Sequence, residues 1–248
     1  MQKLKIKRGR ITLRGYIDKP NQKIESVVIL LHGFGADCGR TKGSLINDCA
    51  KFLNYNGLLV IRVDFYGCGK SDGIFKDMSL STQLEDVLAM VNMVNFYYPN
   101  AKVILLGFSE GGLIASLVAP TLQIDKLVLL APAISMLTEI RRGILLGTSF
   151  DIKHIPNIIN ISKINQTVGK KFIIECINCS EQQISSFYGP VLYCQSLCDE
   201  YVPQEVALKY QNLYFNRIKI RKYDTSNHVF AGYNRKEMLQ DIVDFIRK

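Results

Sequence analysis

Hydrophobic residues along the chain form short apolar runs that alternate with stretches of helical periodicity. Ser26–Leu31 and Lys102–Phe108 are apolar almost throughout, as strands covered on both faces are, whereas Ser79–Tyr97 repeats its apolar positions every three to four residues. Further strands are predicted at Leu58–Phe65, Lys126–Leu130, Val191–Ser196 and Arg217–Tyr223. Further helices are predicted at Gly43–Tyr55, Glu110–Ala119, after Pro203, and at Arg235–Arg247. This alternation predicts the α/β class, with a mostly parallel central sheet flanked by helices.

Two parts of the chain depart from this rhythm. Leu4–Arg8 and Arg10–Tyr16 alternate polar and apolar residues around Gly9, which predicts a hairpin. Residues 133–188 carry no clear strand–helix repeat and are too many for an ordinary connection. We therefore expect a core of residues 1–132 and 189–248 and an inserted lid or cap of residues 133–188.

Composition limits the kinds of partner. With 248 residues, 48% of them apolar, one domain with an insertion is expected. The net charge is +9, but the 31 Lys and Arg are scattered, which predicts a basic, solvated surface and no nucleic-acid partner. No apolar run reaches the roughly 20 residues of a membrane span, and no signal peptide is recognisable. We expect a soluble cytoplasmic protein, either a monomer or a homodimer.

Seven cysteines in a chain without a secretory signal are expected to be free thiols. Four of them follow a spacing close to that of a zinc ribbon: Cys176, Cys179, Cys194 and Cys198. Cys194 falls within a predicted core strand, where its side chain packs. We expect no metal and no organic cofactor, and a zinc-stabilised module remains an alternative.

The sequence Gly-Phe-Ser-Glu-Gly at 107–111 stands between a predicted strand and a predicted helix, the setting of a nucleophile elbow, with Ser109 as nucleophile. A serine needs a base, and His228, which follows the last strand, is the choice among three histidines. Asp199 follows the strand Val191–Ser196 and is the predicted acid, with Glu200 as the fallback. Serine, acid and histidine thus occur in the order that this fold uses.

Acyl transfer also requires donors for the oxyanion of the tetrahedral intermediate. The sequence Leu-His-Gly-Phe-Gly at 31–35 directly follows a core strand, as an oxyanion loop does. We predict that the backbone N–H groups of Phe34 and Glu110 bind the oxyanion. His32 is then a residue that braces the loop, and His154 belongs to the lid.

The chain resembles the α/β-hydrolases of the cinnamoyl or feruloyl esterase type, which border on monoacylglycerol lipases and carboxylesterases. The resemblance rests on LLHGFGA, VDFYGCGKSDGIFKDMSL, GFSEGG, LLAPA, HIP, DEYVP and NHVF, which span nearly the full length. It implies serine-dependent hydrolysis of a small-molecule ester, with the triad and oxyanion residues at the positions argued above. Glu110 departs from the uncharged residue that is usual after the nucleophile.

In feruloyl esterases of this type, polar lid side chains recognise the phenolic ring. The resemblance places Phe172 at a recognising tyrosine, Leu146 at a glutamine and Glu139 at an acidic lid position. A phenylalanine cannot make the hydrogen bond of a phenol, so an apolar acyl group is as plausible as an aromatic one. Thioesterase, lipase or peptidase activity with the same triad, or a non-catalytic ligand-binding relative, remain alternatives.

Overall fold

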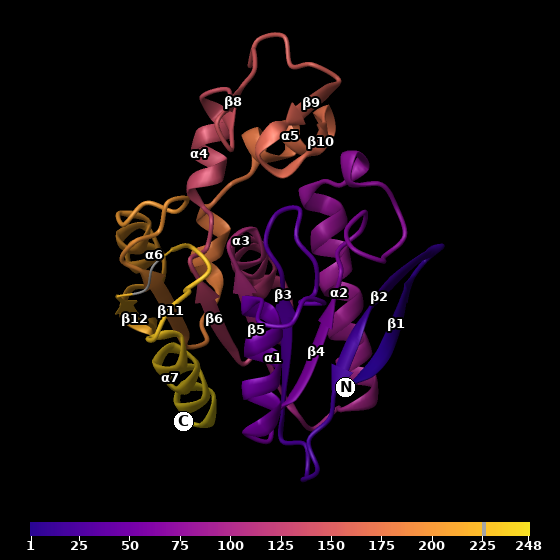
Figure 1. Ribbon diagram of the computed structural model, residues 1–248, viewed down its shortest axis with the longest axis vertical. Coiled ribbons are helices and arrows are strands. Elements are labelled where there is room, and N and C mark those ends of the chain that lie inside the picture. The colour runs from indigo at the N-terminus through magenta and orange to yellow at the C-terminus, as the bar shows by residue number, and fades with distance from the viewer. Residues whose placement is uncertain (225–226) are drawn as a thin grey trace.

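The computed structural model describes residues 1–224 and 227–248 and is built on an eight-stranded sheet (Figure 1). The strand order is β1-β2-β4-β3-β5-β6-β11-β12. The strands are β1 Gln2–Arg8, β2 Ile11–Asp18, β3 Ser26–Leu31, β4 Leu59–Val63, β5 Lys102–Phe108, β6 Lys126–Leu130, β11 Val191–Ser196 and β12 Ile218–Tyr223. Every pair from β4 to β12 is parallel, whereas β1 and β2 form an antiparallel hairpin at one edge. The predicted mostly parallel sheet is confirmed.

Helices cover both faces of the sheet (Figure 1). They are α1 Leu45–Tyr55, α2 Leu80–Tyr97, α3 Glu110–Val118, α6 Val206–Tyr214 and α7 Arg235–Arg247. Contacts between these helices include α1 with α7, α2 with α3, and α3 with α6, where the hydroxyl of Ser116 donates to that of Tyr210. The helix α1 begins two residues later than the periodicity predicts, because Gly43 adopts a left-handed φ of 83° that a helix cannot contain. At the start of α2, Ser79 and Thr82 form a capping box.

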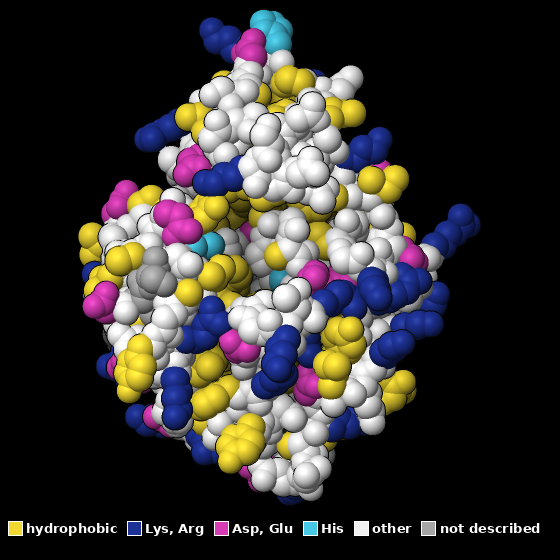
Figure 2. Space-filling model, in the orientation of Figure 1, with side chains coloured by type: hydrophobic (Ala, Val, Ile, Leu, Met, Phe, Trp, Pro, Cys, Tyr) yellow, Lys and Arg dark blue, Asp and Glu magenta, His cyan; other side chains and the backbone are white. Residues whose placement is uncertain are grey.

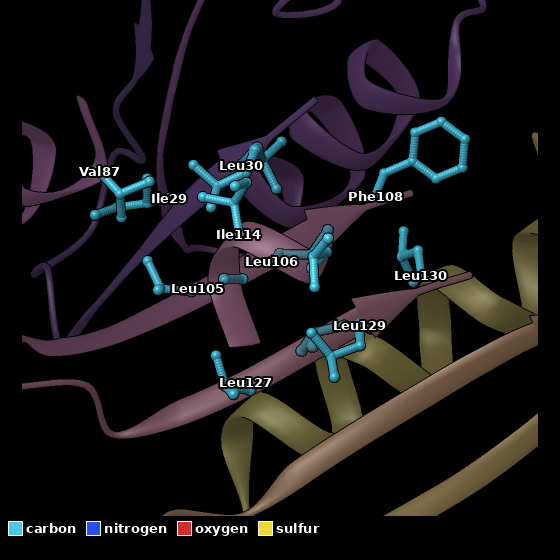
Figure 3. Packing of buried hydrophobic residues seen from close by; sticks show 14 of the residues in the cluster. Ile29, Leu30, Val87, Leu105, Leu106, Phe108, Ile114, Leu127, Leu129 and Leu130 are labelled. Carbon is cyan, nitrogen blue, oxygen red and sulfur yellow. The ribbon is translucent and has the colours of Figure 1, made fainter. Parts of the chain in front are cut away.

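The core lies between the sheet and these helices (Figure 3). All five residues of β4 and of β6 are buried, including the charged Arg62 and Lys126, and the other residues of both strands are apolar. Leu105 and Leu106 of β5 are 0% exposed, and Ile114 of α3 is equally buried. Each such side chain contributes about 1.5–3 kcal/mol when it leaves water. The sheet is therefore a rigid platform for the loops at its ends.

The chain between β6 and β11 forms short elements that rise above the carboxyl ends of the strands (Figure 1). They are α4 Ser135–Arg141, β7 Ile144–Leu145, β8 Thr148–Ser149, β9 Ile158–Ile161, β10 Gln166–Gly169 and α5 Lys170–Asn178. β7 pairs with β8 and β9 pairs with β10, each as a small antiparallel hairpin. We call residues 133–188 the cap segment.

Five 3-10 helices complete the described chain: η1 Phe75–Asp77, η2 Ala119–Thr121, η3 Ser162–Ile164, η4 Gln182–Ser186 and η5 Phe215–Arg217. No helix within residues 1–224 and 227–248 is both long and apolar enough to cross a bilayer.

Candidate active site

Ser109 stands on the sharp turn between β5 and α3. Its backbone has φ 55° and ψ −121°, a left-handed conformation that is strained for a residue with a side chain. Backbone hydrogen bonds hold this turn, because the N–H of Ser109 donates to the carbonyl of Leu130 and its own carbonyl accepts from Ala133. The serine is thus fixed between the ends of two neighbouring strands.

The glycines around Ser109 are required by close backbone approach. A Cβ on Gly107 would lie 2.2 Å from the carbonyl oxygen of Gly111, and a Cβ on Gly111 would lie 2.4 Å from that of Leu31. A Cβ on Gly112 would meet the side chain of Pro132 at 2.8 Å. The predicted elbow sequence therefore has a steric reason, since strand and helix can meet here only without side chains.

His228 and Asp199 form a buried pair. Nδ1 of His228 lies 2.9 and 2.8 Å from the two carboxylate oxygens of Asp199, whose side chain is fully buried. The backbone N–H groups of Tyr201 and Val202 donate to the same carboxylate at 2.8 Å each. The pair leaves Nε2 of the imidazole for another partner, as a general base requires.

The adjacent Glu200 has a different partner. Its carboxylate accepts the backbone N–H of His228 at 2.9 Å, whereas Asp199 contacts the ring. Asp199 thus contacts the imidazole, and Glu200 anchors the loop of the histidine, a contact that the sequence did not reveal.

Two aromatic rings flank the imidazole of His228. The ring of Phe108, the residue before Ser109, has its centroid 4.8 Å away, and the ring of Tyr201 lies at 5.1 Å. The contact with Phe108 brings the histidine to the end of β5, where Ser109 follows. Sequence reasoning missed both residues, although Tyr201 follows the predicted acid by only two positions.

The loop after β3 lies against the elbow. A Cβ on Gly33 would stand 3.1 Å from Cβ of Ser109, so this loop borders the nucleophile. Gly35 has φ 66°, and the N–H of Ala36 closes the turn on the carbonyl of Gly33. Glu110 is the first residue of α3, where a backbone N–H has no acceptor within its own helix. Both predicted oxyanion segments thus adjoin Ser109.

His32 braces the same loop. Its Nε2 accepts the backbone N–H of Phe65 at 3.0 Å, and Nδ1 donates to the carbonyl of Gly33 at 2.9 Å. Burial lowers the pKa of the imidazole, which keeps the ring neutral. Both ring nitrogens are thus used structurally. His154 is far more open, with 85% of its side chain exposed, and it contacts Asp151 within the cap segment.

The side chain of Glu110 is buried beside the nucleophile. Burial raises the pKa of its carboxyl to about 8, and a hydrogen bond with Gln83 of α2 acts in the opposite direction. The side chain is only 1% exposed. At neutral pH this group therefore holds its proton, and no formal charge stands next to the backbone N–H of the elbow.

The conspicuous sequence VDFYGCGKSDG builds a scaffold below the site. Asp64 accepts hydrogen bonds from the backbone of Cys38 and Lys70 and pairs with Arg40. Burial alone would raise the pKa of Asp64, but these hydrogen bonds outweigh it and lower the pKa. Gly69 is required because a Cβ there would lie 2.2 Å from the carboxylate. This network ties the chain after β4 to the chain after β3.

The three predicted lid residues occupy different places. Phe172 of α5 is 0% exposed, and its ring lies 5.4 Å from that of Phe34. Glu139 of α4 lines a pocket of about 290 Å³ together with Pro203, which precedes α6, and burial raises the pKa of its carboxyl. Leu146 has φ 49° in the tight turn between β7 and β8. The contact of Phe172 with Phe34 joins the cap segment to a predicted oxyanion residue.

The cap segment and the core enclose a hollow whose wall carries hydrophobic side chains and histidine (Figure 2). Phe34 of the oxyanion loop packs on Phe75 at 5.3 Å as well as on Phe172. Ile164 of η3 approaches Gly35 of the same loop. The part of the cap segment that faces the oxyanion loop is thus apolar and aromatic.

The zinc-ribbon spacing does not correspond to a cluster. Cys194 lies in the sheet with Sγ 3.8 Å from the hydroxyl of Tyr223, whereas Cys176 lies on α5 of the cap segment. Among the described residues, no three His, Cys, Asp or Glu side chains are grouped to hold a metal ion. The alternative of a zinc-stabilised module is therefore contradicted by the positions of these thiols.

Comparison with known proteins identifies the relatives of the chain. The family model described as serine aminopeptidase, S33, matches residues 22–166. Monoglyceride lipase of Rattus norvegicus is 33% identical over 122 residues, which cover 47% of this chain and 38% of the rat protein. The alignment thus spans well under half of the length of that curated relative.

Solved structures are similar over nearly the whole chain. Est1E from Butyrivibrio proteoclasticus, with ferulic acid bound, matches with a TM-score of 0.90 and 26% identity, covering 98% of this chain and 97% of Est1E. Mouse alpha/beta hydrolase domain-containing protein 10 matches with a TM-score of 0.78 and 18% identity, covering 100% and 99%. The predicted α/β-hydrolase fold and the predicted resemblance are confirmed.

Proposed function

The chain belongs to the serine aminopeptidase S33 family, and from this membership we propose that it is a serine hydrolase that cleaves carboxylic esters with Ser109, His228 and Asp199. The observation that carries the proposal is the buried His228–Asp199 pair at 2.8 Å beside a serine with φ 55°. A buried carboxylate that binds Nδ1 fixes the tautomer whose Nε2 can accept a proton.

Acylation follows from these positions. His228 takes the proton of the Ser109 hydroxyl at Nε2 while the oxygen attacks the ester carbonyl. Asp199 stabilises the imidazolium that forms. The backbone N–H groups of Phe34 and Glu110 bind the oxyanion, and the intermediate expels the alcohol after His228 protonates it.

Deacylation repeats the sequence with water. His228 removes a proton from water, the hydroxide adds to the acyl carbonyl, and the collapse of the second intermediate returns the proton to Ser109. The reaction requires no metal ion and no organic cofactor.

We propose small to medium acyl or aromatic esters as substrates. The apolar contacts between Phe34, Phe75 and Phe172 favour an apolar acyl group close to the oxyanion loop. The relatives support this range, since one is a monoglyceride lipase and another binds ferulic acid. Acyl thioesters, lipids and peptides are alternative substrates of the same triad.

The alternative from another functional class is a non-catalytic ligand-binding protein. It is suggested by the carboxyl group of Glu110, directly after the nucleophile, because a carboxylate there would repel an oxyanion. The pKa of about 8 for Glu110 weakens the case for this alternative, because a protonated side chain carries no charge that would repel an oxyanion at neutral pH.

The decisive experiment is hydrolysis of p-nitrophenyl esters from acetate to octanoate, and of methyl ferulate, by wild type and Ser109→Ala. We expect activity in wild type and a loss of at least about 10³-fold in the variant, because the nucleophile is removed. Far-ultraviolet circular dichroism of both proteins serves as the folding control. A folded wild type that hydrolyses none of these esters and is not labelled by an active-site serine probe would favour the binding protein.

A further inference from the structure

Two consecutive residues of η3, in the cap segment, contact opposite sides of the site. Cδ1 of Ile164 lies 3.1 Å from the position that a Cβ on Gly35 would take, in the oxyanion loop. The ammonium group of Lys163 lies 4.0 Å from the centroid of the Tyr201 ring, in the loop of the acid. The short helix η3 therefore contacts both the loop after β3 and the loop after β11.

Tyr201 links this contact to the base. One neighbour of its ring is the Lys163 ammonium group, and another is the imidazole of His228 at 5.1 Å. Its backbone N–H donates to the carboxylate of Asp199 at 2.8 Å. One residue thus contacts the acid through its backbone, the base through its ring and the cap segment through its ring.

The Asp199–His228 hydrogen bonds fix Nδ1 but leave the imidazole free to tilt about that end. The rings of Phe108 and Tyr201 restrict this tilt by packing on the imidazole. Phe108 is 8% exposed, but Tyr201 is 37% exposed and needs a partner to stay in place. The Lys163 contact supplies that partner, with a cation–π interaction of about 0.5–1 kcal/mol at such an exposed site.

We propose that Tyr201 is a positioning residue for His228 and that Lys163 of the cap segment holds Tyr201 against the imidazole. This inference rests on the proposed function, in which His228 is the base. It gives the cap segment a part in the chemical step, because Nε2 reaches the Ser109 hydroxyl in the right direction only when the ring is held.

The test measures kcat and KM on p-nitrophenyl butyrate for single and double variants. Tyr201→Ala is expected to lower kcat about 10-fold with KM within about twofold, since a misplaced base slows chemistry more than binding. Tyr201→Phe keeps the ring and is expected to stay close to wild type. Lys163→Met is expected to lower kcat about 2- to 5-fold, the equivalent of the cation–π contact, and Lys163→Arg to restore it.

The matched control is Lys153→Met, which removes an exposed lysine of the same cap segment. In the double variant Lys163→Met/Tyr201→Ala, kcat is expected to equal that of Tyr201→Ala, because the lysine acts only through the ring. Additive losses, or equal losses for Tyr201→Phe and Tyr201→Ala, would overturn the proposal.

A second readout does not depend on turnover. Proton nuclear magnetic resonance detects the Nδ1–H that His228 shares with Asp199, and we expect its signal to shift or broaden in Lys163→Met but not in Lys153→Met. An unchanged signal in both overturns the positioning role. If wild type hydrolyses no ester while the signal responds as expected, the proposed function fails and the positioning contact stands.

Discussion

Glu110 is a buried acid with a raised pKa, and it directly follows the proposed nucleophile Ser109. Its pKa of about 8 stands against an ordinary value of 4.5, and burial is the larger cause. Between these two pH values the folded chain keeps a proton that the unfolded chain releases. Stability therefore falls as pH rises from about 4.5 to about 8, by up to about 1.4 kcal/mol per pH unit for one proton.

The variant Glu110→Gln tests this linkage. It is expected to remove most of that pH dependence and to be more stable than wild type at pH 8, with little difference near pH 4.5. Urea unfolding at pH 4.5, 6 and 8 measures the effect, and Glu85→Gln, a change at an exposed acid of α2, is the control. Parallel curves for wild type and Glu110→Gln would contradict the assignment of a neutral Glu110.

The neighbours Asp199 and Glu200 allow a matched comparison of acids. Asp199→Asn is expected to lower kcat about 10³- to 10⁴-fold, because an amide reverses the tautomer of His228. Glu200→Gln keeps an oxygen that accepts the backbone N–H of His228 and is expected to retain activity within about 10-fold. Ester hydrolysis by both variants at one pH decides the matter, and the reverse ranking would make Glu200 the acid.

At the scale of single residues, the sequence indicates candidates that lie in a recognisable motif. It does not indicate residues that matter through their contacts with the imidazole of His228. Ser109 is predicted from the glycines and flanking elements that mark its turn, and His228 from a choice among three histidines; their catalytic roles stay predictions. Tyr201 and Phe108 could not be predicted, since their role depends on two loops folding beside one imidazole. The sequence separation between Lys163 and Tyr201 likewise gives no indication of their contact.

The strand–turn–helix unit of β5 and α3 leaves no room for side chains at its glycines. A Cβ on Gly111 would lie 2.4 and 2.5 Å from the carbonyl oxygens of Leu31 and His32, so β3 and α3 would have to separate. Gly43, by contrast, has φ 83° and open space around it. Substitution of Gly111 therefore tests a steric clash, whereas substitution of Gly43 tests backbone strain alone.

We expect Gly111→Ala to lower the free energy of unfolding by about 3 kcal/mol or more, since overpacking typically costs about 1–3 kcal/mol and the opposing atoms are backbone. Gly43→Ala is expected to lower it by about 1–2 kcal/mol, the strain of a left-handed alanine. Chemical denaturation of both variants gives the comparison. Equal losses would show that the elbow can relax more than its contacts suggest.

The elements of the core were predicted with small shifts, whereas those of the cap segment were not. Short, mostly apolar segments such as β3 and β6 are readily predicted as strands of a parallel sheet, because both faces of such strands are buried. The hairpins β7–β8 and β9–β10 are two to four residues per strand, too short for any periodicity to emerge. Their form depends on packing with α4 and α5.

On the scale of the whole molecule, the site is assembled where the carboxyl ends of the parallel strands meet. The proposed nucleophile follows β5, the proposed acid follows β11 and the proposed base follows β12, so residues far apart in sequence converge at one edge. The alternation of strands and helices predicted this convergence, because parallel strands bring their carboxyl ends together. It could not predict how the cap segment meets the loops.

The position of the cap segment also has a consequence for evolution. β6 and β11 are parallel neighbours, so the chain must cross from the end of one to the start of the other in any case. The cap segment is this obligatory crossover in enlarged form, and the strand pairing places no demand on its length or content. Selection for new substrates can therefore remodel the crossover while the sheet is inherited unchanged. The proposed positioning of His228 requires only that one residue of the cap segment, here Lys163, keeps its contact with the ring of Tyr201.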